Sequence, residues 1–168
     1  WVMSEEPWLK GVSLIDFLKL RASAGLVGNN QQNGRYLYDE SYGYTGEYIF
    51  GTGSSSTGGY GLSTPNPELT WERQTIYNVG LEARLFGSLG ITADLFSQTR
   101  SGIVDRAYAK TPGLTGAAYG DILPYINVGT VKNSGFELSA EWIQRISDDF
   151  DWNIRAGAWY ARNEVIDM

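Results

Sequence analysis

The feature that most constrains this chain is the stretch 71–86, in which side-chain character alternates from one residue to the next. After Trp71 and Arg73 the odd-numbered positions are mainly apolar, whereas the even-numbered positions carry mainly amide, charged and small side chains. A period of two is typical of a β-strand, because successive side chains point to opposite faces. Strands of soluble proteins are usually about 5–6 residues long. The stretch therefore predicts a long strand whose two faces meet different environments.

The composition of the 168-residue chain excludes several kinds of function. The formal net charge of −6 argues against nucleic acid as a partner, because phosphate binding needs a basic surface. The chain has no Cys and no His, which removes disulfides, thiol nucleophiles, serine triads and most zinc sites. We expect no catalytic residue, no cofactor and no metal. The 21 Gly and 11 Tyr residues are instead typical of an all-β protein with many turns.

Further alternating segments and the connections between them predict the topology. The other alternating segments are 18–25, 91–103, 127–146 and the stretch from 152 onward. Short connections at 87–90 and 147–151 alternate with long ones at about 27–70 and 105–126. Short turns at one end and long loops at the other are typical of transmembrane β-barrels. We expect residues 1–168 to be a partial barrel domain: an all-β, antiparallel up-and-down meander of about five strands with two long outer loops.

Smaller features carry predictions of their own. The Tyr-rich segment 35–50 must contribute an even number of crossings, so we expect a small hairpin within the outer loop. The Gly/Ser/Thr-rich segment 51–61 predicts a flexible loop. Ser4 is a candidate cap for a helical turn that Gly11 would end. Gly129, Asn133 and Gly135 indicate a bulge.

The charged residues separate the two faces of the expected strands. A Lys or Arg on the lipid face at mid-membrane costs about 2–4 kcal/mol, so charge is expected on the face of a wet barrel interior. The residues that we expect to face the lumen are Arg21, Glu82, Arg84, Asp94, Glu137, Glu141 and Arg155. Aromatic residues toward strand ends are expected in the membrane girdles. These are Trp71, Trp142, Trp152 and Tyr160.

Several motifs, in this order and spacing, carry a family resemblance. They are Phe17-Leu18-Lys19-Leu20-Arg21-Ala22-Ser23, Asn66-Pro67-Glu68-Leu69-Thr70-Trp71-Glu72, Asn78-Val79-Gly80-Leu81 and Asn133-Ser134-Gly135-Phe136-Glu137-Leu138. Nearly the whole chain resembles the barrel half of SusC/RagA-type TonB-dependent outer-membrane transporters. The resemblance implies a barrel of roughly 22 strands around an N-terminal plug. It also implies import of oligosaccharides or peptides across the outer membrane of Bacteroidota, driven by TonB beneath a SusD-type lid lipoprotein. The plug domain and the remaining strands are absent from this chain, so it resembles a segment of a transporter.

Candidate sites outside the strands have more than one interpretation. Tyrosines of the two long loops are candidates for substrate binding, by stacking on sugar rings, or serve only to pack the loops. They are Tyr36, Tyr42, Tyr44, Tyr48, Tyr108 and Tyr119. Glu137 and Glu141 are either lumen-lining residues paired with arginines or a glycosidase pair. A soluble β-sandwich that binds carbohydrate is the alternative to the barrel, with one face of the sheet packed on a core.

Overall fold

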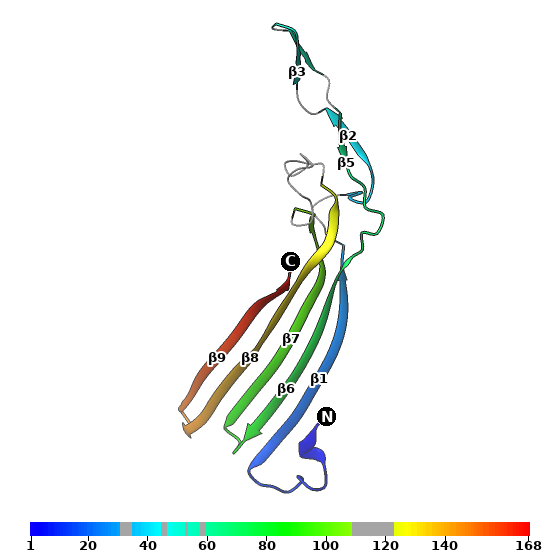
Figure 1. Cartoon of the computed structure of the whole chain (residues 1–168). Helices are drawn as coiled ribbons and strands as arrows, with labels where there is room; N and C mark the ends of the chain where they lie inside the picture. The colour runs from blue at the N-terminus through cyan, green and yellow to red at the C-terminus, as the bar shows by residue number, and fades with distance from the viewer. Residues whose placement is uncertain (31–34, 45–46, 53, 58–59, 109–122) are drawn as a thin grey trace. The chain divides into compact units, whose positions relative to one another are not determined.

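One five-stranded sheet is the main element of the described chain. The computed structural model describes residues 1–30, 35–44, 47–52, 54–57, 60–108 and 123–168. Neighbouring strands follow the order β1-β6-β7-β8-β9 and run antiparallel (Figure 1). Their bounds are β1 (Ile15–Asn29), β6 (Glu72–Leu85), β7 (Leu89–Arg106), β8 (Tyr125–Ser147) and β9 (Phe150–Asp167). The predicted all-β meander is therefore confirmed.

The strands are long and pass through two compact units. One unit contains residues 1–27, 74–100 and 131–166, and the other contains 28–73, 101–130 and 167–168. The shortest of the five strands, β6, has 14 residues, and the longest, β8, has 23. About 9–11 residues of a tilted strand cross a membrane, so every strand is long enough to do so. No helix among the described residues is long and apolar enough to cross a membrane.

A two-residue turn joins β6 to β7. Phe86 and Gly87 both have positive φ, 56° and 66°, and the Ser88 N–H donates to the Leu85 carbonyl at 3.1 Å. Positive φ at both central residues matches a type I′ turn, whose twist suits a hairpin. The turn differs from the sequence expectation, because Phe86 was assigned to the strand and the connection to 87–90. An aromatic residue rarely adopts positive φ, so only Gly87 marked the turn in the sequence.

The loop between β1 and β6 contains two short antiparallel pairs. β2 (Ser41–Tyr44) pairs with β5 (Tyr60–Ser63), and β3 (Glu47–Phe50) pairs with β4 (Ser54–Thr57). The Tyr-rich segment therefore forms pairs within the outer loop, but its partners lie at 54–57 and 60–63, outside the segment predicted to form the hairpin. The prediction of a flexible loop over 51–61 was wrong. Gly, Ser and Thr gave no apolar signal there. The backbone of these residues nevertheless supplies the ladder partners of the Tyr-containing strands.

The N-terminal residues pair with the edge of β1. The Trp1 backbone nitrogen donates to the Leu20 carbonyl at 2.9 Å, and the Leu20 N–H donates to the Trp1 carbonyl at 2.8 Å. A short 3-10 helix, η1 (Met3–Glu5), follows directly and has Val2 at its N-cap position. The prediction that Ser4 caps this turn was therefore wrong. The extended pairing of the first two residues forces the helical turn to begin at Met3, which places Ser4 inside it.

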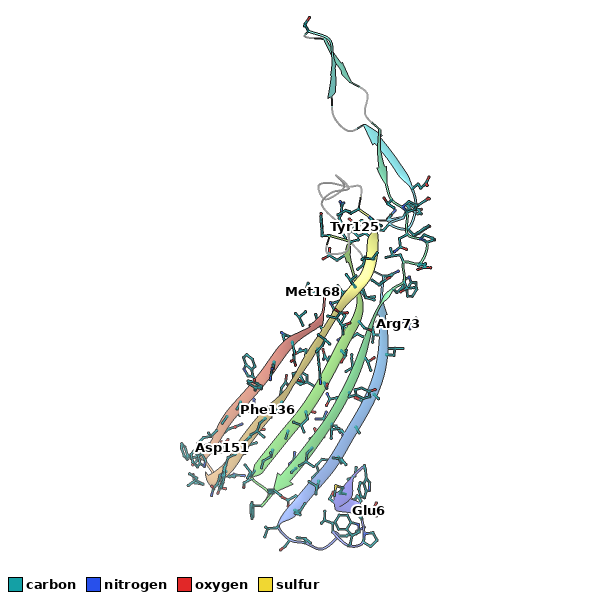
Figure 2. The ribbon with its side chains drawn as sticks, in the orientation of Figure 1. Glu6, Arg73, Tyr125, Phe136, Asp151 and Met168 are labelled. Carbon is teal, nitrogen blue, oxygen red and sulfur yellow. The ribbon has the colours of Figure 1, made fainter. Side chains whose placement is uncertain are left out.

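The apolar face of the sheet is uncovered. Within β6, Tyr77, Val79 and Leu81 are exposed, whereas Gly80 on the opposite face is buried. Among the described residues, only Ala107 and Leu123 are buried apolar residues. Side chains stand away from both faces of the sheet, and no second layer packs on the strands in the described part of the chain (Figure 2). A soluble β-sandwich does not fit this arrangement, because it would bury one face against a core.

A cation placed on the apolar face tests whether lipid covers it. We expect Val79→Arg to lower the free energy of unfolding by about 2–4 kcal/mol, because the guanidinium would be held in hydrocarbon. The measurement is urea unfolding of the full-length protein in phospholipid vesicles. Asn78→Arg places the same charge on the opposite face of β6 and is the control, with an expected cost below about 1 kcal/mol. Equal losses for the two variants would contradict a lipid-facing surface.

Candidate functional site

Ion pairs join neighbouring strands on the polar face of the sheet. Lys19 of β1 lies 3.4 Å from Glu82 of β6, measured from Nζ to Oε2. Gln74 of β6 donates to Gln98 of β7 at 3.1 Å. The same alternation that exposes the apolar side chains therefore gathers polar groups opposite them. Partly exposed ion pairs contribute only about 0.2–1 kcal/mol each, so the backbone ladder, not these pairs, holds the strands together.

A salt bridge between Arg21 and Asp94 passes over an intervening strand. Arg21 is on β1 and Asp94 is on β7, with β6 between them, and Arg21 Nη2 lies 3.0 Å from Asp94 Oδ2. Gly80 of β6 lies beneath this bridge. A Cβ atom there would lie 3.0 Å from Arg21 Nη2 and would also collide with Asp94 Oδ1. Glycine is therefore needed at residue 80 for the bridge to cross the strand, a role that the alternation did not reveal.

A second charged group lies on β8 and β9. Arg155 Nε donates to Glu141 Oε1 at 2.7 Å, and the side-chain amide of Asn153 donates to the same oxygen at 2.8 Å. Glu141, Arg155, Glu82 and Arg84 line a shallow hollow of about 340 Å³. The Glu141 carboxylate is thus paired with an arginine of the neighbouring strand.

Glu137 lines a hollow with Trp159 on the same polar face. This hollow has a volume of about 590 Å³, and Asp94 and Ser139 also line it. Trp159 is 78% exposed, so no described residue covers most of its ring. Trp159 lies an even number of residues after Arg155 in β9 and so shares its face of the sheet. No group of three or more His, Cys, Asp or Glu in the described part of the chain is arranged to hold a metal.

The side chain of Asn127 in β8 binds backbone atoms of Thr70, which precedes β6, and of Gly102 in β7. The Thr70 N–H donates to Asn127 Oδ1 at 2.9 Å. The Asn127 amide donates to the carbonyls of Thr70 and Gly102, each at 2.8 Å. Gly102 has a φ of 66°, a conformation that glycine adopts without strain. We call these three residues the Asn127 lock.

A second asparagine fixes the same segment. The side-chain amide of Asn66 donates to the Tyr125 carbonyl at the start of β8, at 2.6 Å. Its Oδ1 accepts the Glu68 N–H at 3.1 Å, which forms a local turn. The stretch 66–70 is thereby tied to β8, although β7 separates β6 from β8 in the sheet. No periodicity in the sequence predicts this cross-strand anchor.

The expected girdle residues have different positions in the strands. Trp71 directly precedes β6 and is exposed, and Trp152 is near the start of β9. Trp142 donates from its ring nitrogen to Gln144 at 3.2 Å. Tyr160 lies within the middle part of β9 and stacks on Phe136 of β8, with ring centroids 6.1 Å apart. Tyr160 therefore forms a cross-strand aromatic pair on the apolar face.

Only part of the tyrosine set can be placed. Tyr36 and Tyr108 are exposed, and Tyr36 lies beside Tyr38, with ring centroids 6.3 Å apart. Tyr42 and Tyr44 belong to β2 and Tyr48 to β3, where the structure describes the backbone. Tyr119 lies outside the described residues. Of this set, the structure therefore describes the side chains of Tyr36 and Tyr108.

Long antiparallel strands with one uncovered apolar face and one charged face define the wall of a transmembrane β-barrel. The comparison with protein families identifies which kind. The family described as TonB dependent receptor-like, beta-barrel matches residues 7–166, and the chain belongs to this family.

Similar proteins and structures agree with this assignment. The chain is 28% identical over 177 residues to the TonB-dependent receptor SusC of Bacteroides thetaiotaomicron, covering 98% of this chain and 16% of that protein. It is 28% identical over 173 residues to the TonB-dependent receptor P39 of Formosa agariphila, covering 100% of this chain and 15% of that protein. It also superposes on the RagAB peptide importer in its closed-closed state, with a TM-score of 0.73 and 24% identity, covering 100% of this chain and 17% of that one. The chain thus spans about one sixth of the length of each of these proteins.

Removing the Asn127 side chain tests the lock at the base of the first long loop. We expect Asn127→Ala to raise the hydrogen-exchange rate of the Thr70 amide roughly tenfold or more, because each lost hydrogen bond is worth about 0.5–1.5 kcal/mol. The measurement is hydrogen exchange of the full-length protein. Asn133→Ala on the same strand is the control, because Asn133 Oδ1 is buried without a partner among the described residues. An unchanged Thr70 rate in Asn127→Ala would show that the lock does not hold the segment.

Proposed function

We propose that this chain forms one wall segment of an active importer in the bacterial outer membrane. The family match over residues 7–166 carries the proposal, supported by similarity to SusC and to a structure described as a peptide importer. The substrate class is an oligosaccharide or a peptide. TonB energises the cycle through a plug domain, and a SusD-type lipoprotein covers the outer mouth. The segment itself performs no catalysis.

The two faces have separate tasks in this proposal. The apolar face meets the hydrocarbon of the membrane, because no described residue covers it. The polar face lines the wet lumen. The residues assigned to the lumen are Arg21, Glu82, Arg84, Asp94, Glu137, Glu141 and Arg155. Their ion pairs neutralise neighbouring charges of opposite sign, which lets a mixed-charge wall face a plug domain or a neutral substrate.

The long loops contribute the substrate contacts in this proposal. Tyr42, Tyr44 and Tyr48 belong to the first loop, and Tyr108 and Tyr119 to the second. Tyrosine presents a broad apolar ring and a hydroxyl group at low entropic cost. Such rings stack on sugar faces or pack against peptide side chains. The Asn127 lock supports this use, because it fixes the first loop at its base while leaving the tyrosine-containing hairpin outside the sheet.

Uptake by intact cells tests the proposed function. We expect deletion of the full-length protein to lower uptake of fluorescent oligosaccharides or of fluorescent peptides at least tenfold, with recovery on complementation. A protonophore should reduce uptake to the same extent, because TonB transmits the proton-motive force. Normal uptake of both substrate classes in the deletion strain would refute the proposal.

Replacing one tyrosine of the second long loop tests whether that loop contacts the substrate. We expect Tyr108→Ala to raise the substrate concentration for half-maximal uptake about threefold to tenfold, because a stacked ring contributes roughly 0.5–1.5 kcal/mol. Tyr77→Ala removes a similarly exposed ring from the apolar face and is the control, with unchanged concentration dependence. Equal behaviour of the two variants would remove Tyr108 from the substrate path.

A further inference from the structure

An aromatic hollow of about 430 Å³ lies just before the start of β6. The rings of Tyr36, Tyr38 and Trp71 line it together with Arg35. All three rings are largely exposed, with Tyr36 at 70% and Trp71 at 64%. Exposed rings gathered at one place are costly in water, so such a group marks a binding surface.

The backbone at Tyr36 adopts a strained conformation. Its φ is 60°, in the left-handed region that aromatic residues rarely adopt. The Asp39 N–H donates to the Tyr36 carbonyl at 3.0 Å, which closes a turn and sets Tyr36 edge-on against Tyr38. A strained residue that presents its ring to the outside points to a function for that ring.

The ring of Trp71 lies on the apolar face of the sheet. Trp71 Cε3 is 3.4 Å from the place where a Cβ on Gly28 would stand. The next residue, Asn29, points to the other face, where its side-chain amide donates to Glu72 at 3.1 Å. Because successive side chains alternate, Gly28 and Trp71 share the face opposite this polar pair. The hollow therefore borders the surface that we assign to lipid, and not the lumen.

One charged residue is among those that line the hollow. Arg35 lines it and no carboxylate does. Arg73 stands two residues after Trp71 on the same face of β6, where it is exposed, at the start of the strand (Figure 2). Neither arginine forms an ion pair with any residue that the structure describes. A guanidinium offers a planar pair of donors that fits a phosphate group.

We propose that Arg35, Tyr36, Trp71 and Arg73 bind the phosphorylated head group of an outer-membrane lipid. Aromatic rings prefer the level of the head groups, and basic side chains there bind anionic ones. The arginines contact the phosphate, and the rings cover the sugar or glycerol part of the head group and the start of the acyl chains. This assigns Tyr36 to the lipid side instead of the substrate path. The inference rests on the part of the proposed function that places the apolar face in lipid.

Native mass spectrometry of the full-length protein in detergent tests this site without any substrate present. The probe is diphosphoryl lipid A. We expect Arg35→Gln/Arg73→Gln to weaken its binding at least about tenfold, because two charge-assisted contacts are lost. Tyr36→Gly relieves the backbone strain, so this variant folds, and it should weaken binding about threefold. Arg84→Gln/Arg155→Gln removes two arginines from the polar face and is the control, with unchanged lipid binding.

Three results would overturn the proposal. The first is equal binding of lipid A by the wild-type protein and Arg35→Gln/Arg73→Gln. The second is tight binding of dephosphorylated lipid A, or displacement of lipid A by an equal concentration of inorganic phosphate. The third is loss of substrate uptake in Arg35→Gln/Arg73→Gln while lipid binding stays normal, which would make the hollow a substrate site. Normal uptake in the deletion strain would refute the importer, whereas these binding results concern only the lipid site, so the two proposals fail separately.

Discussion

Backbone hydrogen bonds between neighbouring strands are the interaction on which this structure depends. Only two apolar side chains are buried among the described residues, so a hydrophobic core does not hold the strands together. In hydrocarbon an unpaired N–H or C=O costs several kcal/mol, and strands satisfy these groups only through their neighbours. The membrane thus replaces the core as the reason for the fold. It also explains the long strands, because each must remain paired across the whole apolar layer.

The period of two follows from the same constraint. A strand with hydrocarbon on one side and water on the other must sort its side chains by face, and a slip of one residue would place every charge in lipid. The ion pairs therefore matter less for stability than for the composition of the polar face. Gly80 illustrates how the sheet accommodates them. Its missing side chain leaves room for Arg21 and Asp94 to meet across an intervening strand.

The sequence predicted those parts of the fold that depend on local pattern. The strand predicted at 71–86 is observed as β6 at Glu72–Leu85, and the segment 127–146 as β8 at Tyr125–Ser147. The alternation also distinguishes Lys19, which pairs with Glu82, from the apolar residues beside it. The motif resemblance named the family that the comparison then showed.

What the sequence missed depends on contacts between residues far apart in the chain. The Asn127 lock joins three segments, and no periodicity reveals which backbone atoms one amide will reach. The ladder at 54–57 and 60–63 was missed because its residues carry almost no apolar signal. The type I′ turn was misplaced by one residue because Phe86 is an unusual occupant of that conformation. The aromatic hollow escaped notice because Tyr36 and Trp71 are separated in sequence and were assigned to different roles.

The Asn127 lock has a consequence for how this loop can diversify. The Asn127 side chain forms these hydrogen bonds with main-chain atoms of Thr70 and Gly102. They do not depend on which side chain is present at residue 70. The loop between β1 and β6 can therefore differ in length and sequence away from Thr70 without moving its base. One asparagine in the sheet thereby fixes the base of the loop without depending on the side chains of the loop.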